Sequence, residues 1–142
     1  MKKFLKITFY VFIAAFLLIQ LKPVDRSNPK EIADSTIPDE VKVILKAKCY
    51  DCHSNEVHWP WYSYVAPVSW WVADHVEEGR SEVNYSLWDT YSEDKKEEKI
   101  GETFDEVLDG DMPLESYVWI HRGAKVTEAE IDIIDEWLAG EL

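Results

Sequence analysis

The sequence predicts a small all-α domain, preceded by an apolar N-terminal segment. Two observations lead to this prediction. Apolar residues recur at helical spacing in four stretches flanked by capping residues, and no run of period-two alternation bounded by hairpin signals occurs. The 142 residues suffice for one compact domain, and 46% hydrophobic residues exclude a mostly disordered chain. We therefore expect helices joined by long loops around a single core.

The first 22 residues carry the features of an export or anchoring signal. Lys2, Lys3 and Lys6 precede an apolar run over residues 7–21, whose length falls between a signal-peptide core and a bilayer-spanning helix of about 20 residues. Because no small-x-small cleavage pattern or lipidation cysteine follows, residues 1–22 are predicted to be an uncleaved transmembrane signal anchor, with a cleaved signal as the alternative. The positive-inside rule then predicts a single-pass inner-membrane protein whose domain faces the periplasm.

The rest of the chain is predicted to be an acidic domain on a tether. Residues 23–35 contain turn formers without an apolar period and are interpreted as the tether, so the domain spans residues 36–142, with long loops over 54–65 and 109–126. Without residues 1–22 the formal net charge is −17, from 11 basic and 28 acidic residues. Such a charge disfavours nucleic-acid binding and favours a basic or neutral partner surface.

The first two domain helices are placed by capping signals. Thr36 has capping-box spacing and Pro38 occupies the first helical position, which predicts a helix running to about Cys49. A second helix is expected over residues 66–78, closed by Gly79.

The last two helices have signals at both ends. Ser92 is the expected N-cap of the third helix, which should end before Gly110. Thr127 and Glu130 form a capping box that opens the fourth helix, and Gly140 should close it. Both stretches carry apolar residues at helical spacing, so each should pack one face on the core.

Both cysteines of the chain lie in one short run, Cys49-Tyr50-Asp51-Cys52-His53, which is the C-x-x-C-H pattern of covalent haem attachment. Two thiols three residues apart on one turn can reach the two vinyl groups of a haem, and the next imidazole can ligate the iron. Cys49 and Cys52 are therefore predicted to attach one haem c, with His53 as proximal ligand. A disulfide, a thioredoxin-like redox pair and a zinc site are the alternatives.

The sixth iron ligand has two candidates. Met112 is the only methionine besides the initiator, and Pro113 after it favours an extended backbone that projects the thioether from a loop. Met112 is accordingly predicted as the distal ligand. His75, which shares a helical face with Trp71, is the alternative distal ligand. Histidine and methionine ligation leaves no open iron position, which favours electron transfer over catalysis.

Seven tryptophans are an unusual number for a domain of this size. Four of them, close to the cysteine motif and the second helix, are predicted to line the haem pocket and to exclude water from it: Trp59, Trp61, Trp70 and Trp71. Ordinary packing between helices is the alternative for each of these four side chains.

Beyond the cysteine motif, the chain resembles a known family over residues 38–138. The segments CYDCHSN, PWYSYVAPVSWWVADHVEEGR and MPLESYVWIHRGAKVTEAEIDIIDEWL are similar to the bacterial haem-binding domain family, found in exported monohaem c-type cytochromes of Bacteroidota. The resemblance implies a small cytochrome c-like helical domain wrapped around one haem. It also implies that Met112 before Pro113 is the sixth ligand and that the last helix packs on the first.

These observations together predict a membrane-tethered periplasmic electron carrier, not an enzyme, which exchanges electrons with a redox partner protein. Two alternatives stay open. A small haem peroxidase would need a labile sixth iron position, and so would a sensor that responds to ligands. A sensor of haem or redox state would instead require a coupled partner.

Overall fold

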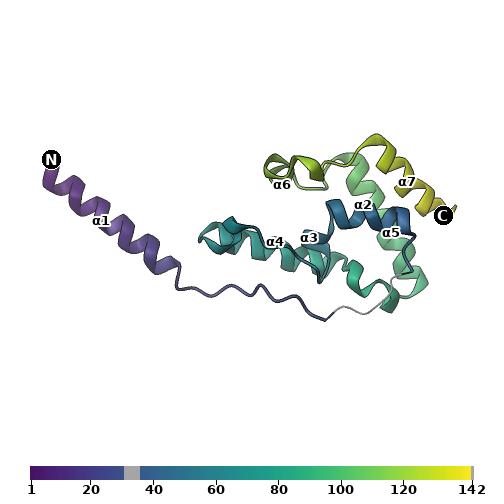
Figure 1. Ribbon diagram of the computed structural model, residues 1–142, viewed down its shortest axis with the longest axis horizontal. Helices are drawn as coiled ribbons and strands as arrows, with labels where there is room; N and C mark the ends of the chain where they lie inside the picture. The colour runs from purple at the N-terminus through teal and green to yellow at the C-terminus, as the bar shows by residue number, and fades with distance from the viewer. Residues whose placement is uncertain (31–35, 142) are drawn as a thin grey trace.

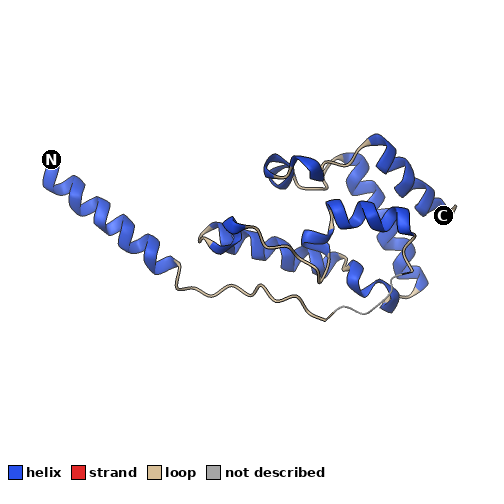
Figure 2. Cartoon of the chain, in the orientation of Figure 1, coloured by secondary structure: helices blue, strands red, loops and turns tan. Residues whose placement is uncertain are grey.

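The chain, described here by a computed structural model over residues 1–30 and 36–141, is helical in every regular element of that part (Figures 1 and 2). Seven α-helices and three short 3-10 helices follow one another, and the described residues contain no strand. The prediction of a small all-α fold is confirmed.

Helix α1, Lys2–Ile19, stands apart from the helical body (Figure 1), and none of its residues is buried. Over residues 1–30 and 36–141, no helix is long and apolar enough to cross a membrane. The expected transmembrane helix within residues 1–22 is therefore not supported. The physical reason is that α1 has only 18 residues and these include Lys2, Lys3 and Lys6.

The core lies among α2 (Asp39–Lys48), α5 (Glu93–Asp109) and α7 (Glu128–Ala139), with α7 in contact with both other helices. The last helix thus packs on the first helix of the domain, as the resemblance implies. Trp88 and Trp137 meet in this core with ring centroids 5.3 Å apart. The buried core cluster consists of Ile37, Val41, Leu45, Tyr50, Val83, Tyr85, Trp88 and Trp137.

The caps of the last two long helices agree with the sequence. The Ser92 side chain accepts a hydrogen bond at the start of α5, and Gly110 ends that helix with φ 81°. Thr127 and Glu130 form the expected capping box of α7, which ends at Gly140 with φ 71°. Both glycines occupy the left-handed region that other residues disfavour.

Two boundaries differ from the prediction. Thr36 does not cap α2, because the helix begins only at Asp39 and Pro38 is its N-cap; the Thr36 hydroxyl donates to the Asp89 carboxylate at 2.6 Å. Helix α4, Val68–Glu82, continues through Gly79, which is buried inside the helix instead of closing it. A close contact with another helix, described below, explains the glycine.

Short helices lie in the two predicted loops and also between the longer helices. The cysteine motif forms α3 (Tyr50–His53), and α6 (Glu115–Ile120) follows Pro113. The 3-10 helices are η1 (Trp61–Tyr64), η2 (Tyr85–Thr90) and η3 (Arg122–Ala124). Within the predicted tether, residues 31–35 lie outside the described residues.

Candidate functional site

The cysteine motif is held tightly against helix α4. A Cβ atom added at Gly79 would lie 3.0 Å from the carbonyl oxygen of Cys52 and 3.2 Å from its Cβ. The nearest atom belongs to the backbone of Cys52, so it cannot rotate away to make room for a side chain at position 79. Gly79 is therefore the residue that lets α3 and α4 approach at this point.

The same crossing orients His53. Its Nδ1 lies 2.8 Å from the Gly79 carbonyl oxygen and 3.3 Å from that of Val83. A carbonyl only accepts hydrogen bonds, so Nδ1 carries the proton and Nε2 keeps a free lone pair. Burial lowers the pKa of His53, which favours this neutral form. Metal-bound histidines commonly show such a bond from the second ring nitrogen to a backbone carbonyl.

One cavity of about 490 Å³ brings the predicted ligands together. Cys49, Cys52 and His53 line it from α3, Met112 lines it from the loop after α5, and His75 lines it from α4. The volume lies within the range of small-molecule and cofactor pockets. Residues distant in the sequence thus meet at a space large enough for a bound group.

The two thiols are free, and their surroundings do not activate them. Burial raises the pKa of Cys49 to about 12 and that of Cys52 to about 11. A redox-active C-x-x-C pair needs a thiolate with a lowered pKa, so the structure disfavours a thioredoxin-like role. In the described part of the chain, no three His, Cys, Asp or Glu residues are grouped to hold a metal ion, so a zinc site is not supported either.

The two distal candidates approach the cavity from different elements. Met112 is half-buried, and its backbone N–H donates to the Glu106 carbonyl oxygen at 3.0 Å just beyond the end of α5. His75 donates from Nδ1 to the Trp71 carbonyl oxygen at 2.8 Å, which leaves its Nε2 with a free lone pair. Both side chains could therefore present a donor atom to the cavity.

The four tryptophans expected around the pocket separate into two groups. Trp59 and Trp71 line a second, smaller hollow of about 50 Å³ next to the cavity. Trp61 is 79% exposed on η1, and Trp70 packs under the ammonium group of Lys22, 4.9 Å from its ring centroid. No tryptophan lines the larger cavity, and Trp61 and Trp70 line neither hollow, so the lining of a haem pocket by these four side chains stays a prediction.

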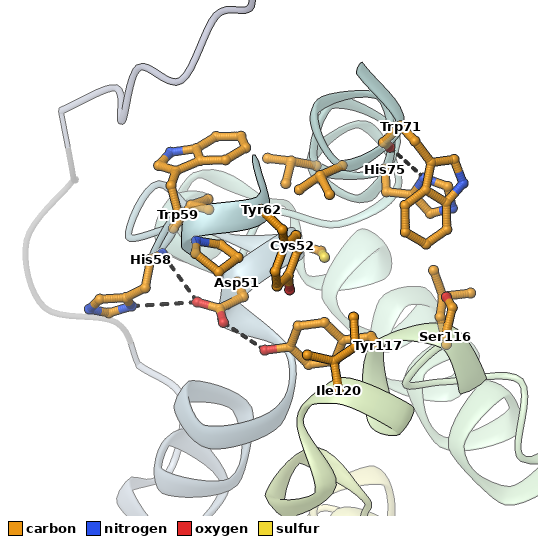
Figure 3. Close-up of a pocket in the computed structure, with 15 residues that line it drawn as sticks. Asp51, Cys52, His58, Trp59, Tyr62, Trp71, His75, Ser116, Tyr117 and Ile120 are labelled. Carbon is orange, nitrogen blue, oxygen red and sulfur yellow. Dashed lines mark hydrogen bonds and ion pairs between the residues drawn. The ribbon is translucent and has the colours of Figure 1, made fainter. Parts of the chain in front are cut away.

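The smaller hollow holds a hydrogen-bonded group that the sequence did not indicate (Figure 3). Tyr117 of α6 donates to the Asp51 carboxylate at 2.6 Å, and burial followed by this bond raises the pKa of Tyr117. The Tyr62 hydroxyl lies 2.7 Å from His121 Nε2, and the His121 ring stacks on Tyr117 at 4.4 Å. Asp51 lies between the two cysteines, so this bond ties α6 directly to the cysteine motif.

Sequence reasoning also missed Tyr85, which lines the larger cavity and is only 2% exposed. Its ring stacks on Tyr50 with centroids 6.0 Å apart, and its hydroxyl lies 2.8 Å from Thr103 Oγ1 of α5. Tyr85 follows α4 after a two-residue break, in a stretch without helical periodicity, so no sequence signal selected it.

A family model described as a haem-binding domain matches residues 14–140, which is well over half of the chain. The matched range includes the end of α1 and every helix from α2 to α7. Neither a curated protein nor a solved structure matches this chain.

Proposed function

The chain belongs to the haem-binding domain family, and we propose that it is a monohaem c-type cytochrome that transfers single electrons. The observation that carries the proposal is the set of groups around one cavity of about 490 Å³: the Cys49 and Cys52 thiols, the His53 imidazole and the Met112 thioether. Two thiols, one imidazole and one thioether are the groups that hold a c-type haem. The residues present therefore fit the cofactor.

Each residue has a distinct task in this proposal. Cys49 and Cys52 attach the haem, which when bound supplies a one-electron couple at its iron. His53 presents Nε2 as proximal ligand, and the Gly79 carbonyl fixes its ring orientation. Met112 supplies the sixth ligand from a loop. Because the protein would then supply both remaining iron ligands, the arrangement would favour electron transfer over substrate chemistry.

Covalent attachment can be tested by mass. The full chain is expressed with a c-type cytochrome maturation system and denatured, and its mass is then measured. We expect the haem mass to stay with the unfolded chain and to be lost in the double variant Cys49→Ala/Cys52→Ala. The single variants serve as controls, since each keeps one thiol. A parent chain without the haem mass would refute covalent attachment and leave haem binding to be tested with added haem.

The distal ligand can be tested by spectroscopy. Ligation by Met112 predicts a weak near-infrared sulfur-to-iron band in the oxidised protein, which Met112→Ala should abolish while it opens the iron to carbon monoxide. If the parent shows no such band and His75→Ala is the change that lets carbon monoxide bind the iron, the distal ligand is His75. Ready carbon monoxide binding by the parent would favour the peroxidase or sensor alternatives.

Export and an acidic docking surface complete the proposal. Three lysines followed by an apolar run over residues 7–21 are typical of an export signal, and c-type haem would be attached outside the cytoplasm. A reporter fused after residue 142 should be active only outside the cytoplasm. With a net charge of −17 after residue 22, the domain should favour a redox partner with a basic surface, and its association rate should fall as salt rises.

A further inference from the structure

Residues 20–28, which run from the end of the predicted anchor into the predicted tether, are hydrogen-bonded along the loop before α4. The Gln20 side-chain amide both donates to and accepts from the Ala66 backbone, at 3.1 and 2.9 Å. The Asn28 amide pairs in the same two-way manner with the Val57 backbone, at 3.0 and 3.3 Å. These two pairs run antiparallel along the loop and fix where α1 meets the domain.

Further contacts strengthen this attachment. The Arg26 guanidinium donates twice to the Ser63 carbonyl oxygen, at 2.9 and 2.6 Å, and lies over the Tyr64 ring at 4.5 Å. Arg80 of α4 donates to the Ser27 carbonyl oxygen at 3.2 Å. The end of α1 is therefore held at the corner formed by η1 and the start of α4, as its position in Figure 1 shows.

The same corner exposes large apolar side chains. We name it the corner surface, and its members are Trp61 at 79% exposure, Tyr64 at 59%, Val68 at 41% and Val65 at 37%. Helix α1 beside it carries apolar or aromatic side chains on every side over residues 9–19, and none of its residues is buried. A helix with apolar residues on every side is suited to a surrounding apolar medium more than to a groove that covers one face.

The distribution of charge separates this region from the rest of the chain. Residues 1–30 hold six lysines and arginines but a single acidic residue, a net charge of +5, whereas the remaining residues carry a net charge of −18. An anionic surface would therefore attract the α1 end and repel the opposite end of the domain.

From these observations we propose that α1 and the corner surface dock together on a lipid bilayer with anionic headgroups, so that the docked segment 20–28 fixes the orientation of the cavity relative to that surface. Tryptophan and tyrosine are the residues enriched at the boundary between headgroups and acyl chains, and lysine and arginine beside them contact anionic headgroups. The proposal does not depend on haem binding or on electron transfer.

The test uses the full chain with vesicles of phosphatidylethanolamine and phosphatidylglycerol. Hydroxyl-radical footprinting, read by peptide mass spectrometry, measures oxidation of Trp61 with and without vesicles. Trp119 on α6 is the internal control, because it has the same 79% exposure but lies outside the corner surface. We expect vesicles to protect Trp61 and Tyr64 and to leave Trp119 unchanged.

A matched pair of variants supplies the second measurement. Trp61→Ser should weaken vesicle binding by about tenfold, the effect of taking one large apolar side chain out of an apolar environment, whereas Trp119→Ser should leave binding unchanged. Three outcomes would overturn the proposal: equal protection of both tryptophans, unprotected Trp61 in a chain that floats with the vesicles, and protection of Trp61 by rising protein concentration without lipid. The last outcome would assign the corner surface to a second copy of the chain.

Discussion

The two sides of the cavity are built in different ways. The proximal wall, residues 49–53 and 79–85, is packed by the protein itself: Tyr50 is 5% exposed and Tyr85 is 2% exposed. The distal wall, residues 110–120, has no buried residue in α6, and Met112 is only half-buried. The difference shows that the core of the protein packs the wall that carries His53, whereas the wall that carries Met112 is only partly covered by the rest of the chain.

This comparison predicts that substitutions in the proximal wall cost more stability than substitutions in the distal wall. Tyr85→Ala should have the largest effect. It removes a fully buried ring that stacks on Tyr50, and by analogy with other large-to-small core substitutions it should lower the free energy of unfolding by about 3–5 kcal/mol. Urea denaturation of the haem-loaded protein measures this change.

Since such a loss can exceed the stability of a small domain, Tyr85→Phe provides a milder variant. It keeps the ring and removes only the hydrogen bond to Thr103, so the loss should be about 1 kcal/mol. Equal effects of the two variants would show that ring packing contributes little, and the comparison of the two walls would then be wrong.

Gly79→Ala should rank second. The added Cβ would lie 3.0 Å from a backbone oxygen of Cys52, so α3 and α4 must separate, at a cost of about 1–3 kcal/mol. Gly101→Ala, inside α5, is the matched control, because its Cβ would meet nothing closer than Leu138 of α7 at 4.0 Å. The control should stabilise the protein by roughly 0.5–1 kcal/mol through helix propensity. A stabilising Gly79→Ala would show that the contact is not tight.

The sequence predicted those parts of the molecule whose signals are local. Capping residues located α5 and α7, because Ser92, Gly110 and Thr127 act on the backbone within a few positions of themselves. The spacing of Cys49 and Cys52 predicted a haem-attachment site in the same local way, and the structure brings both thiols to one cavity. These predictions did not require knowledge of how the helices pack.

Predictions failed where a distant contact decides the structure. The sequence predicted a helix end at Gly79. The glycine is needed there for another reason: it has no side chain at the point where α4 packs against Cys52, 27 positions earlier in the chain. Thr36 has a capping spacing, but its hydroxyl and its backbone N–H both donate to Asp89 of η2, and α2 begins only at Asp39. The tryptophans were judged by type and proximity in the sequence, which does not show that Trp61 faces solvent. Periodicity likewise carries no information about Tyr117 meeting Asp51.

Tyr117→Phe should rank third and tests how the distal wall is attached. It removes the 2.6 Å hydrogen bond to Asp51, a bond to a carboxylate in a half-buried position, and should lower the free energy of unfolding by about 1.5 kcal/mol. Hydrogen exchange should rise in α6 and stay unchanged in α4. Tyr62→Phe, which removes the bond to His121, is the control on the same hollow. Faster exchange in α4 would contradict the separation of the two walls.

The smallest effect is expected for the contact that holds η2, the element carrying Tyr85, to the start of the domain. Asp89 accepts hydrogen bonds from the Thr36 hydroxyl and backbone at 2.6 and 2.9 Å, and these bonds lower the pKa of Asp89 below its ordinary value of 3.8. Because the folded state favours the ionised carboxylate, this stabilisation is complete above pH 3.8 and is lost as the pH falls through the lowered pKa.

Asp89→Asn should therefore cost about 0.5 kcal/mol at neutral pH, a small value because the carboxylate is exposed, and the difference from the parent should shrink in acid. Thr36→Val, which keeps the backbone donor, should give part of that loss, and urea denaturation across the acid range measures both variants. A difference between parent and Asp89→Asn that stays constant into strong acid would show that the charge of Asp89 does not hold η2 in place.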